Sequence, residues 1–308
     1  MSFSNQNWQE FCKLYKLQLP DFKEDEYYLS VLAKCPGYEW IPDRLAEFKT
    51  LVTSLETGTT ATDYKFKQMQ RLVEWFKTSP GLKALEAVRK PEGTQEFDKM
   101  NSLPSEHVYI SIDLKQANYS VWRKYDQSLP PTWEELMIKL EVAPALANSK
   151  SFRQIVFGNL NPKRLQQAQA AETYVIKGML ESEQNPCVRW SADEVTFAVP
   201  IRGIPMFISD YIAKVAHAYN ILANRITVFK LEPLPDLGSV QVFYTYKNGA
   251  LIETKRELFG VPGNLMFIAL KEHILKEPVV LLDLLFRAEG RKAYWAHPAL
   301  GVDKTPRD

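Results

Sequence analysis

The stretch CVRWSADEVTFAVP, at residues 187–200, determines the fold that we expect of this chain. Apolar and polar side chains alternate on both sides of two adjacent acids, Asp193 and Glu194, and this period of two is typical of β-strands. The stretch therefore predicts a hairpin of two strands with both acids at its tip. Acidic side chains in this position suit a site that holds divalent metal ions.

A third acid, Asp113, ends another apolar run, HVYISI at residues 107–112. Two strand-borne acidic sites that lie apart in the sequence are what a two-metal phosphoryl-transfer centre requires. A structural interpretation stays open for each acid. An Asp after a strand often caps the following helix, and an Asp-Glu pair in a hairpin is often a solvated turn.

Composition limits the class of protein. The chain has 308 residues, of which 45% are apolar, and a formal net charge of +1. This length predicts one large domain or two, and the small net charge means that any basic surface must be local. Three unclustered cysteines, no apolar signal core and no run of bilayer length predict a soluble intracellular protein without membrane contact. Its location would be cytoplasmic or associated with a virus or phage.

Several other chemistries lack their motifs. The sequence contains no GxxxxGK[ST] loop and no GxGxxG fingerprint, which disfavours P-loop and dinucleotide-binding folds. It has no nucleophile-elbow sequence for Ser-His-Asp hydrolysis. The four histidines are scattered without metal-ligand spacing.

The order of elements predicts three consecutive segments. Residues 1–105 show helical spacing of apolar residues and would form a thumb-like or partner-binding region. Residues 106–237 would form a sheet domain with short helices, and residues 238–308 a β-hairpin with two helices. The last hairpin would turn at Asn248-Gly249, and its helices would begin near residues 263 and 278.

The expected order within residues 106–237 is strand, helix, two hairpin strands, helix, strand. This order is the split βαβ plan of ferredoxin-like sheets. We therefore expect an α+β fold, in which a helical N-terminal region precedes a ferredoxin-like polymerase palm with an antiparallel sheet. In this plan the strand that ends at Asp113 lies beside the hairpin, so that Asp113 and Asp193 can share the same metal ions.

The motifs resemble those of the family-A DNA polymerases, in the same chain order. The family's first palm motif, Asp-Tyr-Ser-Gln-hydrophobic-Glu-Leu-Arg, corresponds to DLKQANYS at residues 113–120, and its His-Asp-Glu motif corresponds to ADE at residues 192–194. The Lys and Phe-Gly of its fingers helix correspond to Arg and Phe-Gly in SFRQIVFG at residues 151–158.

The chain also departs from the family pattern. Ala192 replaces the family's His, and Asn161, followed by Pro162, replaces its Tyr and would interrupt the helix. The short spacing between Phe157 and Asp193 is closer to that of reverse transcriptases and viral RNA-dependent polymerases.

The resemblance implies a role for each acid. Asp113 and Asp193 would ligate Mg²⁺ or Mn²⁺ together with the carbonyl group of Leu114. Glu194 would be a weaker ligand or a partner of the ligands.

The resemblance also implies a set of nucleotide-binding residues. Arg153 and Lys150, one helical turn apart, would face the triphosphate, and the fork of an arginine matches phosphate oxygens. Phe157 would stack against the incoming base or sugar. Asn118 takes the position of the family's 2′-hydroxyl-excluding Glu and can hydrogen-bond a ribose, while Tyr119 beside it is the alternative steric gate.

A basic stretch follows these residues. SKSFRQIVFGNLNPKR, at residues 149–164, interleaves basic and aromatic side chains, so that Lys163 and Arg164 are expected to contact a nucleic-acid backbone. The alternative is an ordinary amphipathic helix face.

Two functions are compatible with this sequence. The first is a template-dependent or terminal nucleotidyltransferase that uses nucleoside triphosphates to extend DNA or RNA by a two-metal mechanism. The second is a catalytically inactive palm-derived protein that binds nucleic acid or assembles with replication or other partner proteins. The second is favoured by the loss of the family's His and Tyr.

Overall fold

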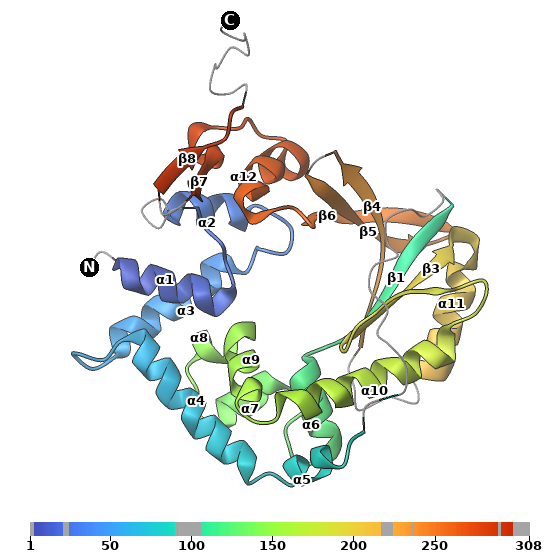
Figure 1. Cartoon of the computed structure of the whole chain (residues 1–308), viewed down its shortest axis with the longest axis horizontal. Helices are drawn as coiled ribbons and strands as arrows, with labels where there is room; N and C mark the ends of the chain where they lie inside the picture. The colour runs from blue at the N-terminus through green and yellow to red at the C-terminus, as the bar shows by residue number, and fades with distance from the viewer. Residues whose placement is uncertain are drawn as a thin grey trace, which may run out of the picture. The chain divides into compact units, whose positions relative to one another are not determined.

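The computed structural model describes residues 3–20, 25–89, 91, 106–216, 224–235, 237–288 and 291–297. The fold is α+β, as the sequence predicts (Figure 1). Most of the loop expected at residues 90–106 and the 217–223 end of the helix expected from residue 205 lie outside the described residues. No helix of the described chain has both the length and the apolar character needed to cross a bilayer.

The chain divides into two compact units that are not consecutive in sequence. One unit comprises Thr57–Lys230 and Tyr244–Ile252, and the other comprises Met1–Glu56, Leu231–Phe243 and Glu253–Asp308. This division differs from the three segments expected above. The helices that follow residue 57 belong with the acidic strands, and the C-terminal hairpin is shared between the units.

Six strands form the main sheet: β1 (His107–Leu114), β2 (Cys187–Trp190), β3 (Glu194–Pro200), β4 (Asn224–Leu234), β5 (Gly238–Lys247) and β6 (Ala250–Phe259). Their spatial order is β2-β3-β1-β4-β5-β6. β1 is antiparallel to β3 and to β4, and β2 is antiparallel to β3. Two parallel pairs, β1 with β2 and β3 with β4, are thus each separated by one antiparallel strand.

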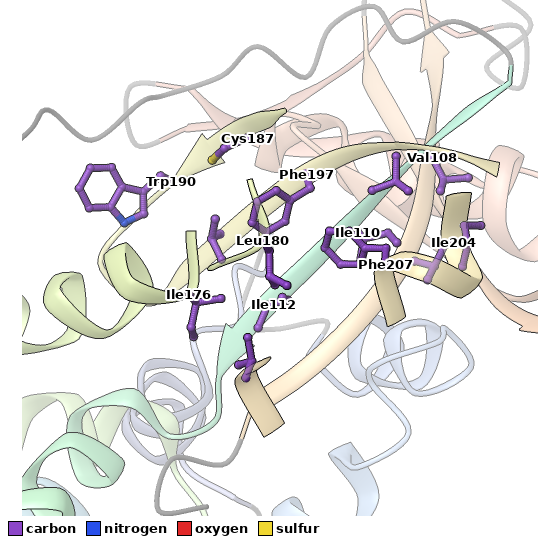
Figure 2. Close-up of a cluster of buried hydrophobic side chains, with 14 of the residues drawn as sticks. Val108, Ile110, Ile112, Ile176, Leu180, Cys187, Trp190, Phe197, Ile204 and Phe207 are labelled. Carbon is purple, nitrogen blue, oxygen red and sulfur yellow. The ribbon is translucent and has the colours of Figure 1, made fainter. Parts of the chain in front are cut away.

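The alternating apolar residues of β1 and β3 face one core, together with α10 (Pro162–Leu180) and α11 (Ile204–Asp210). Figure 2 shows Ile176 and Leu180 of α10, and Ile204 and Phe207 of α11, among these side chains. The strand residues of this core are Val108, Ile110, Ile112, Leu114, Val195, Phe197 and Val199.

This core fixes which side chains reach the other face of the sheet. Each fully buried aliphatic or phenyl side chain stabilises the fold by about 1.5–3 kcal/mol, and a one-residue slip would turn all of them outward. The alternate residues of β1 therefore point away from α10 and α11. These residues are Tyr109, Ser111 and Asp113.

The unit that comprises Thr57–Lys230 and Tyr244–Ile252 contains six further helices. They are α4 (Ala61–Lys77), α5 (Pro80–Glu86), α6 (Ala117–Tyr125), α7 (Trp133–Lys139), α8 (Pro144–Ala147) and α9 (Lys150–Gly158). An aromatic cluster packs α4, α6, α7 and α9 together. The ring of Phe157 lies 5.1 Å from that of Phe76, 5.8 Å from Trp122 and 5.7 Å from Trp133.

The interruption expected near Pro162 separates α9 from α10. Pro162 is the first residue of α10, where its missing N–H costs no helical hydrogen bond. Asn161 caps this helix, because its Oδ1 accepts a hydrogen bond from the backbone N–H of Arg164 at 3.3 Å. Asn161 thus has a helix-capping role.

The other unit holds α1 (Asn5–Tyr15), α2 (Asp25–Ala33), α3 (Ile41–Ser54) and α12 (Met266–Ala269). The Tyr28 ring packs 4.7 Å from Phe267, and its hydroxyl donates to the Leu282 carbonyl at 2.9 Å. The prediction of a helix from residue 278 is wrong. That segment forms a short 3-10 helix, η5 (Leu281–Leu284), and a hairpin of β7 (Leu285–Ala288) and β8 (Arg291–Tyr294).

Helical residues also flank α11 and α12. They form the 3-10 helices η1 (Ile201–Gly203) and η3 (Gly263–Leu265), and the π-helices η2 (Tyr211–Ala216) and η4 (Leu270–Leu275). The helix expected near residue 263 is therefore present as η3, α12 and η4.

Candidate active site around Asp113 and Asp193

The β2–β3 turn holds the acidic tip in a defined conformation. The hydroxyl of Ser191 donates to Asp193 Oδ1 at 3.1 Å and accepts from the backbone N–H of Glu194 at 3.1 Å. The backbone N–H of Ser191 also donates to the Glu194 carbonyl at 2.8 Å. Asp193 is thus the exposed last residue of the turn, and Glu194 is the first residue of β3.

A backbone hydrogen bond joins this turn to the end of β1. The N–H of Leu114 donates to the carbonyl of Asp193 at 2.8 Å. In the register of β1 and β3, Asp113 lies opposite Glu194. The two acidic sites that the sequence predicts as partners therefore lie side by side.

The carboxylate of Glu194 is engaged on the surface of the sheet. Its Oε1 accepts from the hydroxyl of Ser111 at 2.6 Å, and its Oε2 lies 3.5 Å from Nη1 of Arg189. Both partners project from neighbouring strands on the same face. These contacts fit an auxiliary role for Glu194 better than direct metal ligation, because they already use both oxygens.

Burial and the neighbouring acids change the acidity of Asp113. The pKa of its carboxyl is raised to about 6, chiefly by removal from water and also by the charges of Asp193 and Glu194. The cations of Arg225 and Lys150 oppose this rise. A carboxyl with a raised pKa among other acids is typical of functional sites.

The donor set fits a magnesium ion that is completed by a substrate. In the part of the chain that the structure describes, no group of three or more His, Cys, Asp or Glu side chains is placed to hold a metal ion. Mg²⁺, however, is commonly held by one or two carboxylates plus waters and substrate phosphates. Asp113 and Asp193, whose backbones adjoin and whose charges interact, offer two carboxylates for such an ion.

Of the two cations expected at the triphosphate, Lys150 is the one whose charge acts on Asp113. Lys150 is the exposed first residue of α9, next to the capping residue Ser149. Arg153 instead lies 4.0 Å from Glu134, and only 12% of its side chain is exposed. The Arg153 side chain is therefore committed to a partner on α7.

Glu134 also holds the loop that follows Asp113. Nε2 of Gln116 donates to Oε1 and Oε2 of Glu134 at 2.7 and 2.6 Å, and Oε1 of Gln116 accepts from the backbone N–H of Trp133 at 3.2 Å. Gln116 adopts a left-handed backbone with φ 50°, a conformation that is unfavourable for a residue with a Cβ. These side-chain bonds stabilise it.

Three residues expected at the nucleotide, Phe157, Tyr119 and Asn118, are buried or half-buried in the structure. Phe157 is 1% exposed within the aromatic cluster, which leaves no ring face for a base, and this burial contradicts the expected stacking role. Tyr119 is also 1% exposed, and its hydroxyl donates to the Pro130 carbonyl at 2.7 Å, so that it is no steric gate in this arrangement. Asn118 is half-buried, and its Oδ1 accepts from Nε2 of Gln169 at 2.6 Å.

The basic pair expected to contact nucleic acid lies at the start of α10. Lys163 is exposed. Arg164 is half-buried, and its Nη1 donates to the Val88 carbonyl at 2.8 Å and to Gln167 Oε1 at 3.1 Å. Lys163 therefore keeps the expected accessibility, whereas Arg164 has a structural role.

Sequence reasoning missed Arg225, Gln116 and Glu134. Arg225 is the cross-strand partner of Asp113 on β4, and its Nη2 lies 3.5 Å from Asp113 Oδ2. A single basic residue before an apolar strand gives no signal by itself, since its partner depends on the register.

No protein-family model, curated protein or solved structure matches the chain.

Proposed function

We propose that the chain is a nucleotidyltransferase that extends DNA or RNA, either on a template or at a free end, by a two-metal mechanism. The observation that supports this function most is the bond between the Leu114 N–H and the Asp193 carbonyl at 2.8 Å. It brings together two acids that lie 80 positions apart in the sequence.

The order of the strands supports a ferredoxin-like palm as the scaffold. In a split βαβ unit, two parallel strands joined through a helix are separated by a third strand. Here β1 and β2 are separated by β3, and β3 and β4 are separated by β1. Two interlocked units of this kind place the end of β1 beside the β2–β3 turn, where palm enzymes carry their metal ligands.

The expected reaction is attack of a 3′-hydroxyl on the α-phosphorus of a nucleoside triphosphate, with pyrophosphate leaving. Bound Mg²⁺ or Mn²⁺ would activate the attacking oxygen and stabilise the charge on the leaving group. Asp113 and Asp193 would hold the ions, Glu194 would orient the acidic face, and Lys150 would bind the triphosphate. The Leu114 carbonyl is the remaining expected ligand.

A second candidate is a palm-derived protein that binds nucleic acid or assembles with other proteins without catalysis. Two observations favour it. Phe157 is in the aromatic core instead of facing a nucleotide, and Arg153 is paired with Glu134. Such a protein would bind nucleic acid equally well with and without a chelator.

The test is nucleotide incorporation by the whole chain with labelled ribo- and deoxynucleotides, on primed and unprimed DNA and RNA, with Mg²⁺ or Mn²⁺. Asp113→Ala and Asp193→Ala are compared with Asp210→Ala, a matched control whose side chain is 48% exposed and pairs with Lys214 on the same helical face. Circular dichroism confirms that each variant is folded.

We expect incorporation by the wild-type protein and the Asp210 variant, and a loss of at least about a thousandfold in the other two, because both ions lose a ligand. Incorporation by the double Asp113/Asp193 variant at the wild-type rate would exclude this site. Chelator-insensitive nucleic-acid binding with no incorporation on any substrate would favour the second candidate.

A further inference from the structure

Arg225 is a cation on the strand next to Asp113. It pairs with Asp113 in the register of β1 and β4, and its Nη2 lies 3.5 Å from Asp113 Oδ2. Lys150, by contrast, comes from α9. Of the two cations whose charges act on Asp113, one therefore comes from a helix and the other from the neighbouring strand.

The contact between Arg225 and Asp113 is easily exchanged. The Arg225 side chain is 62% exposed, and the distance of 3.5 Å exceeds the roughly 2.7–2.9 Å that is typical of a charged hydrogen bond. The Asp113 side chain is 31% exposed, but water reaches the Arg225 guanidinium, and an ion pair with such an exposed partner adds little to stability. Arg225 can leave Asp113 at small cost when another charge takes its place.

A second arginine shows the opposite arrangement. Arg189 lies 3.5 Å from Glu194, but the two side chains are only 30% and 24% exposed, and Glu194 also accepts from Ser111 at 2.6 Å. This pair belongs to a network across three strands. Arg189 is therefore a fixed counter-charge, whereas Arg225 is a movable one.

We propose that Arg225 binds the phosphate groups of the nucleotide substrate, to which it moves when Asp113 becomes a metal ligand. This inference rests on the proposed function. Once Asp113 ligates a divalent cation, that cation neutralises the negative charge of its carboxylate. The cation also repels the guanidinium of Arg225. The phosphate oxygens that complete the metal site then offer Arg225 the planar two-oxygen geometry that a guanidinium prefers.

Two binding measurements on the whole chain test this exchange without relying on catalysis. The first is titration with Mn²⁺ alone, read from the electron paramagnetic resonance signal of the free ion. The second is calorimetric titration with inorganic tripolyphosphate in the presence of Mn²⁺. The proteins are the wild type, Arg225→Gln, Arg225→Lys and the matched control Arg189→Gln.

Arg225→Gln is expected to bind Mn²⁺ about threefold to tenfold more tightly, because the competing cation is removed, and tripolyphosphate about tenfold more weakly. Arg225→Lys is expected to keep the wild-type Mn²⁺ affinity and to recover part of the tripolyphosphate affinity. Arg189→Gln is expected to change either affinity by less than about twofold, since Arg189 contacts Glu194 in the wild type and is not among the cations that act on Asp113.

Unchanged tripolyphosphate affinity in Arg225→Gln, or weaker Mn²⁺ binding by this variant, would overturn the role of Arg225 while leaving the metal site intact. Asp113→Asn separates this outcome from failure of the proposed function. If Asp113→Asn binds Mn²⁺ as tightly as the wild type, the metal site itself is wrong, and the role of Arg225 is overturned with it.

Discussion

The backbone N–H of Leu114 donates a hydrogen bond to the carbonyl of Asp193 at 2.8 Å, and this bond joins the end of β1 to the β2–β3 turn. Because the core residues of β1 and β3 fix the register, Asp113 and Asp193 must meet at this edge whenever the sheet forms. The sheet therefore assembles the acidic pair as a consequence of folding.

Divalent cation binding should weaken in acid. The pKa of Asp113 is about 6, so that protons compete with the cation below this pH. We expect the Mn²⁺ affinity to be constant above about pH 7 and to fall by about tenfold for each pH unit below 6. Titration at several pH values measures this, and an affinity independent of pH between 5 and 7 would contradict it.

Replacing Asp113 should stabilise the fold. Its folded pKa is raised above the ordinary 3.8, so the protonated form stabilises the native state, and this contribution is lost as the pH rises from about 4 through 6. The shift corresponds to roughly 3 kcal/mol, and partial solvation of the carboxylate reduces it. We expect Asp113→Asn to raise the free energy of unfolding at pH 7.5 by about 1 kcal/mol.

Urea unfolding of the wild type and of Asp113→Asn at pH 4.5 and pH 7.5 checks the sign. The stability difference should be small at the lower pH and favour the variant at the higher pH. A variant that is less stable than the wild type at pH 7.5 would mean that the pair with Arg225 outweighs the burial of the charge.

Phe157 should matter for stability and not for nucleotide affinity. Because the ring is 1% exposed in the aromatic cluster, Phe157→Ala is expected to cost about 3–5 kcal/mol in the free energy of unfolding. Phe157→Leu keeps most of the volume and should cost about 1–2 kcal/mol. A tenfold rise in the nucleotide KM of a stable Phe157→Leu protein would instead support the base-stacking role.

Lys150 should matter for nucleotide affinity, and Arg153 for the stability of the fold. Lys150 acts on Asp113, so Lys150→Ala is expected to weaken nucleotide binding by about tenfold with little effect on stability. Arg153→Ala is expected to lower the free energy of unfolding, because it removes the charged partner of Glu134. Calorimetric titration with a nucleoside triphosphate distinguishes the two variants, and Lys139→Ala serves as an exposed control. Equal nucleotide affinities in the Lys150 variant and the control would contradict the assignment.

The parts of this fold that the sequence predicted are those with a strong local pattern. The hairpin, β1 and the break at Pro162 follow from alternation and from proline chemistry, and each is present. The apolar run at residues 278–286 has no such pattern, because a short run suits either a helix or a strand. It forms η5 and then β7.

Side-chain roles were harder to predict than elements. Phe157 and Tyr119 have the same helical spacing whether they pack inward or face a ligand, and only the packing of α4, α6 and α7 decides it. The pairing of Arg225 with Asp113 depends on a cross-strand register that one sequence does not show. The two compact units were missed because β4, β5 and β6 each contribute residues to both.

The most direct test of the shared metal site is anomalous diffraction from crystals of the whole chain grown with Mn²⁺ and a nucleoside triphosphate. The predicted result is an anomalous peak bonded to the carboxylates of both Asp113 and Asp193, with Arg225 turned from Asp113 toward the phosphates. Mn²⁺ bound elsewhere, or carboxylates too far apart to share one ion, would contradict the account.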